Sequence, residues 1–299
     1  MERPLDNVAV VGAGILGAQI ALLAAHAGYR VRCYDPRAGA LAETLNKIRR
    51  DLENKKAVVP LVPFALWDST LARVRSDRTL EDALAGADLV IEAAPENLEL
   101  KKKVWKDLGD QAPAKAILAT NSSSLPVSRM EEAGGRPQQS LNIHFYFPLQ
   151  GVNHVDVMGG TATTPETMAA GIKWVRSLGC IPLTVNKELL GFCFNRVWRA
   201  IKRETLYMWG GGFVDFRDVD RGWMVFTGMK EGPFAIMDKV GLDVVRDIEM
   251  VYYRESGDPR DHPPQALLDM IERGDLGVKS GRGFYSYPDP EYLAPGFLS

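Results

Sequence analysis

The segment from Val8 to Asp35 constrains the fold of this chain more than any other. An apolar β-type run over residues 8–11 leads directly into the turn Gly-Ala-Gly-Ile-Leu-Gly, and an apolar helical pattern over 18–27 and a second β-type run over 29–35 follow. This order predicts a strand, a glycine turn, a helix and a second strand that pack together as one unit. Units of this kind bind dinucleotides, so the sequence predicts a nucleotide cofactor.

The three glycines of the turn have separate roles in such a unit. Gly12 allows the tight turn, Gly14 lets a phosphate approach the backbone because it has no Cβ, and Gly17 allows the helix to lie close to the strand. The free N–H groups and the positive dipole end of the helix attract the phosphates. The predicted cofactor contacts in the turn are Gly12, Gly14, Ile15, Leu16 and Gly17.

Asp35, at the end of the second strand, indicates which dinucleotide is bound. Its carboxylate can accept hydrogen bonds from the ribose hydroxyls, and its charge would repel a 2′-phosphate. The motif therefore favours NAD over NADP. Arg30, Arg32 and Arg37 lie close by in the sequence and keep NADP open as a second possibility.

Composition and charge argue against several other classes of protein. The chain has 299 residues, of which 46% are hydrophobic and 25% are charged, and its formal net charge is −2. These values are typical of a soluble globular protein with room for two domains, and they argue against an extended nucleic-acid interface. No apolar run approaches the length of a membrane span, and the N-terminal residues do not read as a signal peptide.

The cysteines and histidines indicate a cytoplasmic protein without a metal site. The three cysteines, Cys33, Cys180 and Cys193, form no CxxC pair, which predicts reduced, buried thiols. The four histidines show no zinc-type spacing, so no metal ligand is predicted.

Strands and helices continue to alternate as far as residue 187. The β-type runs cover residues 87–92, 116–120, 140–145, 155–158 and 181–185, and the helical patterns cover 38–56, 98–108 and 164–178. Thr164 is the expected N-cap of the last of these helices, and Pro165 suits its first position. The alternation predicts an α/β fold, a doubly wound and mostly parallel sheet of Rossmann type.

From Glu188 onward the pattern is helical and β-type runs are absent. Helices are expected over residues 189–209, 215–226, 235–240 and 243–253, the first of them terminated by three glycines. The sequence therefore predicts two domains, a dinucleotide-binding domain over residues 1–187 and a second, all-α C-terminal domain over residues 188–299. The apolar first helix of the second domain is either part of its core or a dimer interface.

Polar side chains near the ends of the later strands are candidate catalytic residues, because ligands on such a sheet lie beyond the carboxyl ends of its strands. Ser123 lies in a polar loop that follows the strand over 116–120, and His144 lies within an aromatic run. Asp156 lies on the next strand and Asn195 on the first long helix of the second domain. Taken alone, the loop also fits a simple turn, and His144 also fits a buried core histidine.

Together these residues resemble the L-3-hydroxyacyl-CoA dehydrogenase family. The resemblance covers nearly the whole chain and rests on ordered blocks at residues 8–17, 92–98, 121–125, 144–145, 191–196, 232–243 and 277–285. It implies an NAD-dependent oxidoreductase that interconverts a 3-hydroxyacyl-CoA, or a similar β-hydroxy acid, and its 3-keto product. It also implies a homodimer with its active site in the cleft between the two domains.

The resemblance also implies a role for each candidate residue. His144 would take the proton from the substrate hydroxyl, since an imidazole titrates near neutral pH, and Asp156 would orient the imidazole and stabilise its charged form. Ser123 and Asn195 would hydrogen-bond the substrate oxygen. Glu96, Lys101 and Ser123, together with Lys279 from the C-terminal segment, match family positions near the cofactor.

Three departures from the family pattern concern the substrate side of the site. Asp156 replaces a glutamate, which shortens the reach toward His144 by one methylene. Phe147 replaces an asparagine, which removes hydrogen bonds toward the cofactor. Thr44 and Asp51 align with the serine and lysine that meet coenzyme A. Nearby cations could replace that lysine, or they could form a solvated face: Arg49, Arg50, Lys55 and Lys56.

The sequence is also compatible with two other functions. The departures at Asp51 and Phe147 favour a relative that acts on a free hydroxy acid, such as a carnitine-type or gulonate-type dehydrogenase, whereas the block at 277–285 favours the acyl-CoA enzymes. A non-catalytic NAD-binding protein is the third possibility. The presence of four candidate catalytic residues argues against it: Ser123, His144, Asp156 and Asn195.

Overall fold

The computed structural model describes residues 5–53, 62–146 and 153–298. The chain divides into two compact units, residues 1–194 and 195–299, and each is described by itself. The domain boundary expected between residues 187 and 188 thus lies a few residues before the point at which the compact units divide.

An eight-stranded sheet forms the centre of the first unit, with strand order β3-β2-β1-β4-β5-β6-β7-β8. All neighbouring strands are parallel except the antiparallel pair β6 and β7. The order reverses direction between β1 and β4, which is the place where sheets of this class bind ligands. The strands are β1 (Asn7–Val11), β2 (Arg30–Tyr34), β3 (Val74–Ser76), β4 (Leu89–Glu92), β5 (Ile117–Thr120), β6 (Ser140–Phe145), β7 (His154–Gly159) and β8 (Ile181–Val185).

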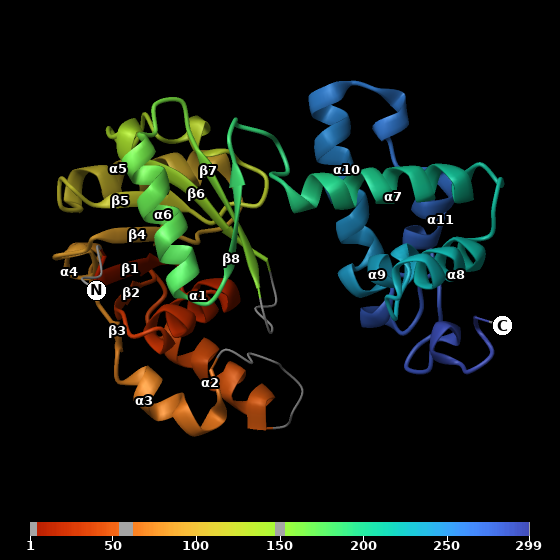
Figure 1. Ribbon diagram of the computed structural model, residues 1–299, viewed down its shortest axis with the longest axis horizontal. Coiled ribbons are helices and arrows are strands. Elements are labelled where there is room, and N and C mark those ends of the chain that lie inside the picture. Colours follow the sequence, from red (N-terminus) through yellow and green to blue (C-terminus); the bar gives the residue numbers. More distant parts are fainter. Residues whose placement is uncertain (1–4, 54–61, 147–152, 299) are drawn as a thin grey trace. The chain divides into compact units, whose positions relative to one another are not determined.

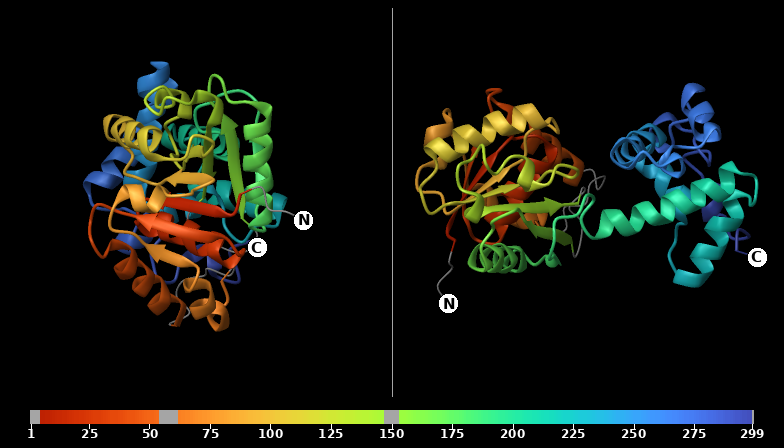
Figure 2. Two further views of the ribbon diagram at one scale, coloured as in Figure 1. Left: turned by 90° about the vertical axis from the view of Figure 1, so that its left-hand side faces the viewer. Right: turned by 90° about the horizontal axis from the view of Figure 1, so that it is seen from above.

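Helices cover both faces of this sheet (Figures 1 and 2). Apolar side chains of α1, α2, α3 and α6 pack on one face, and those of α4 and α5 pack on the other. The helices are α1 (Ile15–His26), α2 (Ala40–Glu53), α3 (Trp67–Leu71), α4 (Leu80–Leu84), α5 (Leu98–Gln111) and α6 (Pro165–Ser177). Thr164 caps α6 as expected, since its side chain accepts a hydrogen bond from the N–H of Thr167. The predicted Rossmann-type α/β fold is confirmed.

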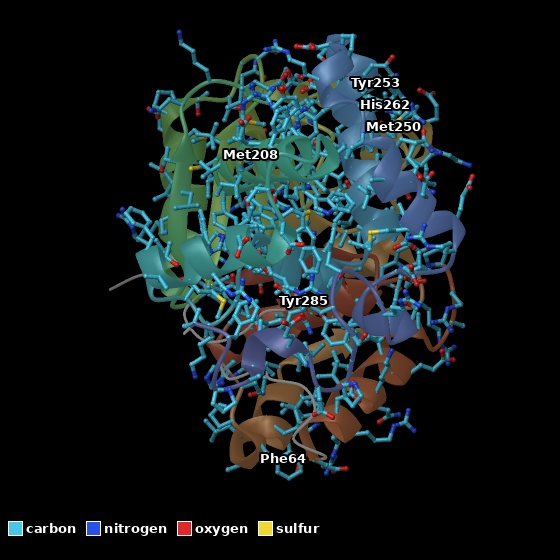
Figure 3. The ribbon with its side chains drawn as sticks, turned by 90° about the vertical axis from the view of Figure 1, so that its right-hand side faces the viewer. Phe64, Met208, Met250, Tyr253, His262 and Tyr285 are labelled. Carbon is cyan, nitrogen blue, oxygen red and sulfur yellow. The ribbon has the colours of Figure 1, made fainter. Side chains whose placement is uncertain are left out.

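The described residues of the second unit form helices and no strands, as predicted. Its core contains Phe234 of α9, Leu242 and Val245 of α10, and Tyr285 of the C-terminal segment, which is labelled in Figure 3. The helices are α7 (Phe194–Gly210), α8 (Phe216–Thr227), α9 (Pro233–Val240), α10 (Leu242–Ser256) and α11 (Gln265–Glu272). The helix expected after Pro63 is α3. Neither α11 nor the short elements α4 and β3 was predicted, because each is too short to show a clear hydrophobic period.

The expected start of the first long helix at residue 189 was wrong. The helix begins at Phe194, because Gly191 and Phe192 take positive φ angles of 81° and 52°, which a right-handed helix cannot include. The expectation of three buried thiols was also wrong. Cys33 and Cys180 are buried, but Cys193 is exposed, because Phe192 takes the buried position in this turn.

Among the described residues, no helix is both long enough and apolar enough to cross a membrane.

Candidate active site

The glycine turn after β1 is built as the motif predicts. A Cβ at Gly12 would lie 2.5 Å from the carbonyl oxygen of Ala93, and one at Gly17 would lie 2.0 Å from the carbonyl oxygen of Gly12. Both glycines are therefore required by the protein's own packing. A Cβ at Gly14 would meet no atom of the described residues within 4 Å, so their packing does not explain a glycine there. The open backbone fits the predicted approach of a phosphate.

The N-terminus of α1 is open to an anion. Its N-cap is Gly14, which has no side chain to satisfy the first N–H groups, and its first turn carries no acidic residue. Ile15 is 37% exposed, and Leu16 follows it in the same turn. Free N–H groups together with the helix dipole fit a pyrophosphate at this position.

Asp35 directly follows β2, and its carboxylate binds the backbone of the glycine turn after β1. Its Oδ2 accepts a hydrogen bond from the N–H of Ala13 at 2.8 Å, and its Oδ1 accepts one from the N–H of Arg37 at 2.9 Å. A cavity of about 500 Å³ lies beside it, lined by residues 33–41, 76–78 and Ala13. The site thus offers space for a nucleoside next to a carboxylate that still has lone pairs for ribose hydroxyls.

The nearby arginines do not form a free binding site for a 2′-phosphate. Arg32 donates two hydrogen bonds to Asp77, at 2.9 and 3.0 Å, and Arg37 lies 2.5 Å from Glu43. The Arg32 guanidinium holds the pKa of Asp77 below its ordinary value, although burial opposes this. Two of the three arginines that kept NADP open are therefore already paired with acidic side chains of the protein.

A buried ion pair organises the loop after β4, and sequence reasoning missed one of its partners, Glu92. The ammonium of Lys101 is 2.7 Å from Glu92 Oε1 and 3.0 Å from the carbonyl oxygen of Ala94, and both charged side chains are almost inaccessible to solvent. Thr120 donates to the other carboxylate oxygen of Glu92 at 2.8 Å. An acid within the apolar run 87–92 was the signal available in the sequence.

Glu96 lies at the open side of this loop. Its carboxylate accepts hydrogen bonds from the hydroxyls of Ser122 and Ser124, at 2.5 and 2.8 Å, and lies 3.5 Å from the Lys101 ammonium. Burial alone would raise the pKa of Glu96, but these hydroxyls and Lys101 outweigh it and lower the pKa. The buried Lys101 therefore stabilises the charged form of Glu96. A direct contact of either residue with the cofactor stays a prediction.

His144, Asp156 and Ser123 form one hydrogen-bonded chain. His144 and Asp156 are direct cross-strand partners in the antiparallel pairing of β6 and β7. His144 Nδ1 is 3.3 Å from Asp156 Oδ2, and His144 Nε2 is 3.0 Å from Ser123 Oγ. A carboxylate beside Nδ1 requires the proton on that nitrogen, which leaves Nε2 free to accept one.

Two aromatic residues hold the imidazole, and sequence reasoning gave neither a role. The ring of Phe192 stacks on His144 with centroids 5.0 Å apart, and Tyr146 meets it edge-on at 4.5 Å. Phe192 is the one non-glycine residue with positive φ among those described. No local sequence signal predicts that backbone conformation for phenylalanine.

His154 lies beside this chain without joining it. Its ring packs against Tyr146 and Phe194 at centroid distances of 4.4 and 4.8 Å. Burial lowers its pKa, and Asp156 opposes the shift. These contacts give His154 a packing role beside the chain.

The remaining predicted site residues lie elsewhere. Asn195 and Lys279 belong to the second unit, where the Lys279 ammonium pairs with both carboxylate oxygens of Asp243 at 2.5 Å, so their roles stay predictions. Thr44 donates a hydrogen bond to the carbonyl oxygen of Ala13 at 3.0 Å, and this bond ties α2 to the glycine turn. Phe147, Lys55 and Lys56 lie outside the described residues.

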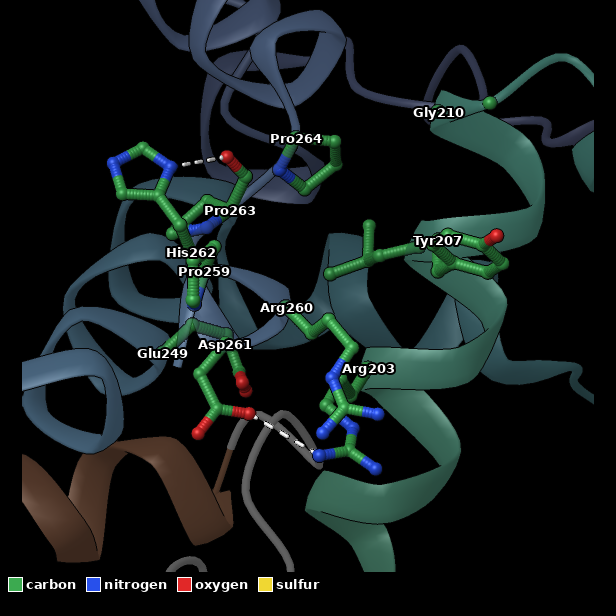
Figure 4. A pocket seen from close by; sticks show the side chains of 12 residues that line it. Arg203, Tyr207, Gly210, Glu249, Pro259, Arg260, Asp261, His262, Pro263 and Pro264 are labelled. Carbon is green, nitrogen blue, oxygen red and sulfur yellow. Dashed lines mark hydrogen bonds and ion pairs between the residues drawn. The ribbon is translucent and has the colours of Figure 1, made fainter. Parts of the chain in front are cut away.

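A second cavity, of about 370 Å³, lies in the second unit between α7, α10 and the segment 259–264 (Figure 4). Arg203 at its wall pairs with Asp261 at 3.2 Å, and Arg260 pairs with Asp258 at 2.7 Å. Both arginines are thus already neutralised within the protein. Within the described residues, no group of three or more histidine, cysteine or acidic side chains is placed to hold a metal ion.

Comparison with known proteins places this geometry in context. Two family models match the chain: 3-hydroxyacyl-CoA dehydrogenase, NAD binding domain, over residues 7–189, and 3-hydroxyacyl-CoA dehydrogenase, C-terminal domain, over residues 191–287. A probable 3-hydroxybutyryl-CoA dehydrogenase of Bacillus subtilis is 34% identical over 289 residues, which are 95% of this chain and 98% of the relative.

Solved structures agree with these matches. The (S)-3-hydroxybutyryl-CoA dehydrogenase of Ralstonia eutropha superposes with a TM-score of 0.83 at 30% identity, covering 95% of this chain and 100% of that one. A diketoreductase described as acting on dicarbonyl compounds gives a TM-score of 0.84 at 34% identity, covering 95% of this chain and 99% of that one.

Proposed function

This chain belongs to the 3-hydroxyacyl-CoA dehydrogenase family, and we propose that it interconverts a 3-hydroxyacyl-CoA and the corresponding 3-ketoacyl-CoA with NAD as its redox partner. The single observation that carries the proposal is the chain Asp156–His144–Ser123 at the carboxyl end of the sheet. It pairs a base with a group that orients it and leaves an exposed hydroxyl beside the reacting nitrogen.

The proton step follows from the tautomer of His144. Oxidation of a secondary alcohol removes a proton from oxygen and a hydride from carbon. The proton passes from the substrate hydroxyl to Nε2, while Nδ1 keeps its own proton and donates it as a hydrogen bond to Asp156. The imidazolium formed in this way is stabilised by the buried carboxylate, and in the reductive direction the same proton returns to the substrate oxygen.

Ser123 places the substrate oxygen. Its side chain is exposed while His144 beside it is buried, so an incoming oxygen reaches both Ser123 Oγ and Nε2. A hydrogen bond from the serine hydroxyl polarises a carbonyl in the reductive direction. We assign the second hydrogen bond to Asn195.

The residues of the glycine turn fit the cofactor. Gly12, Gly14 and Gly17, with the N–H groups at the start of α1, would hold the pyrophosphate, and Asp35 would hold the adenosine ribose. Glu96 and Lys101 are assigned to the nicotinamide side, and Lys279 to the same cofactor from the C-terminal segment. Bound NAD supplies the hydride acceptor.

A coenzyme A thioester is the proposed substrate, and the chain is proposed to act as a cytoplasmic homodimer. Large apolar side chains are exposed on the second unit, among them Phe213 at 70% and Phe226 at 89%, and they support an interface with a second copy. A free β-hydroxy acid is the alternative substrate, and Asp51 on α2 is the residue that favours it.

The test measures NADH oxidation by the purified protein with acetoacetyl-CoA and then with acetoacetate. Turnover with the thioester and little with the free acid is the expected result. The His144→Gln variant should lose roughly 10²- to 10⁴-fold in kcat and bind NADH normally. His26→Gln, at the far end of α1, is the control and should keep full activity.

Other outcomes separate the alternatives. Turnover with acetoacetate alone would support a free hydroxy acid dehydrogenase, and NADH binding without turnover on either substrate would support a non-catalytic protein. Full activity of His144→Gln would contradict the assigned base. Sedimentation of the same preparation at the monomer mass would contradict the homodimer.

A further inference from the structure

We propose that Tyr146 is a positioning residue for the proton transfer, because its hydroxyl holds the Asp156 carboxylate in the place from which that carboxylate orients His144. The proposal rests on the proposed function and adds a residue to its machinery. Tyr146 directly follows β6, two residues after His144, and its hydroxyl donates a hydrogen bond of 2.5 Å to Asp156 Oδ2.

The hydrogen bond from Tyr146 is the shortest contact of this carboxylate. The His144 Nδ1 contact with Oδ2 is 3.3 Å long, and the N–H of Cys193 lies 3.3 Å from Oδ1. N–H···O hydrogen bonds normally fall between about 2.7 and 3.2 Å, so both of these contacts are long. The carboxylate is therefore fixed mainly by the phenol rather than by the imidazole that it serves.

Burial explains why Asp156 needs such a partner. Its side chain is fully buried, and a buried carboxylate is stable only when hydrogen-bond donors surround it. Without the phenol, the Asp156 carboxylate would keep one long contact on each oxygen and could rotate away from His144. The imidazole would then lose the group that selects its tautomer.

The ring of Tyr146 is itself held in place. It lies 4.4 Å from the ring of His154 and 5.6 Å from that of Phe194, in addition to its edge contact with His144. A phenylalanine would keep all three ring contacts and lose the hydroxyl alone. The Tyr146→Phe variant is therefore a specific probe of the hydrogen bond.

Tyr146 acts through Asp156 and not on the substrate. Its hydroxyl lies on the Nδ1 side of the imidazole, whereas Ser123 marks the Nε2 side, where the substrate oxygen is placed. The removal of the hydroxyl should therefore change the rate of proton transfer and leave cofactor binding unchanged.

The experiment is a double-mutant cycle of Tyr146→Phe and Asp156→Glu, with NADH oxidation by acetoacetyl-CoA as the assay. Tyr146→Phe should lower kcat about 10-fold, in line with a lost hydrogen bond to a charged group, with an unchanged Kd for NADH. The longer side chain of Asp156→Glu can reach His144 without the phenol. When Asp156→Glu is already present, Tyr146→Phe should therefore lower kcat by less than about 3-fold. Tyr253→Phe, in the second unit, is the control for loss of a phenol hydroxyl elsewhere.

Each result decides the matter. An unchanged kcat in Tyr146→Phe would overturn the positioning role. An equal loss of kcat with Asp156 and with Glu at that position would do the same, and so would a loss of NADH affinity in Tyr146→Phe. If Tyr146→Phe is too unstable to assay, the double variant still tests the proposal, since it should fold and turn over as Asp156→Glu does. An inactive wild-type protein would instead contradict the proposed function.

Discussion

Asp35 connects the glycine turn with the end of β2 through a single carboxylate. One oxygen accepts the N–H of Ala13 in the turn, and the other accepts the N–H of Arg37 in the following loop. The same carboxylate is therefore part of the turn before any cofactor binds. Its negative charge is also the feature that we propose favours NAD over NADP.

Substitution of Asp35 should weaken NAD binding and reduce the preference for NAD. Asp35→Ala should raise the Kd for NADH about 10- to 100-fold, because hydrogen bonds to a charged group are lost. Asp35→Asn keeps a hydrogen-bond acceptor, so its Kd for NADH should lie between those of the wild type and Asp35→Ala. Because it loses the negative charge, its ratio of NADH to NADPH affinity should be lower than that of the wild type. Fluorescence titration with both cofactors measures these values.

The control for Asp35 is Asp110→Asn, which removes an exposed carboxylate at the end of α5. It should leave both affinities unchanged. Wild-type NADH affinity in Asp35→Ala would refute the ribose contact.

At the scale of elements, the turn between β1 and α1 combines a packing requirement with a binding one. Gly12 and Gly17 are forced by backbone contacts within the first unit, whereas Gly14 has open space where a Cβ would lie. Gly14 also has φ −62° and ψ 178°, a conformation that alanine adopts without strain. Substitution of Gly12 or Gly17 should therefore lower stability, whereas substitution of Gly14 should weaken cofactor binding.

Alanine at the two positions should separate folding from binding. Gly14→Ala should keep the free energy of unfolding within about 1 kcal/mol of the wild type and weaken NADH binding by roughly 10-fold or more. Gly17→Ala should lower the free energy of unfolding by about 1–3 kcal/mol or more, because its Cβ would overlap a backbone oxygen. Urea unfolding and NADH titration of both variants provide the measurements. The reverse pattern would contradict this division of roles.

The pairing of β6 with β7 is the second element-scale feature that makes the site. Because these strands run antiparallel, His144 and Asp156 become direct partners although they lie on different strands. A shift of the register by one residue would place the two side chains on opposite faces. The proposed catalytic pair thus depends on the pairing of the sheet as much as on the two residues.

At the scale of the whole molecule, both units combine apolar cores with buried carboxylates. In the second unit, two of these carboxylates accept hydrogen bonds from backbone N–H groups. Asp220 accepts them from Phe234 and Ala235 and so joins α8 to the start of α9. Asp238 accepts them from Phe284 and Tyr285 and so fastens the C-terminal segment to α9.

Asp220 should make the stability of the second unit depend on pH. Burial raises its pKa to about 6, although hydrogen bonds from Phe234 and Ala235 oppose the shift. The folded protein therefore binds this proton more tightly than the unfolded chain does. The resulting stabilisation is complete below about pH 4 and is lost as the pH rises through about 6, by up to roughly 3 kcal/mol.

Urea unfolding of the wild type and of Asp220→Asn between pH 4 and 7 measures this effect. The stability of the wild type relative to the variant should fall as the pH rises across this range. Asp258→Asn is the control, because the hydrogen bond from Arg260 lowers the pKa of half-buried Asp258 to about 2, so its contribution to stability changes only at more acidic pH. A difference between wild type and Asp220→Asn that does not vary with pH would contradict the role of Asp220.

The sequence by itself determined the fold class, the cofactor motif and the family, because these depend on local features. Apolar periodicity marks strands and helices, and the glycine turn with Asp35 is a short segment whose chemistry does not depend on distant residues. The family resemblance is confirmed by matches over both parts of the chain.

Only the tertiary structure decided how the site is built. The spacing of His144 and Asp156 does not reveal that they are cross-strand partners, and nothing local indicates that Tyr146 donates to that carboxylate or that Phe192 takes a positive φ. Contacts between distant segments fix these features. The same reason explains the burial of Lys101 against Glu92, since a lysine on an amphipathic helix is normally solvated unless a buried acid lies opposite it.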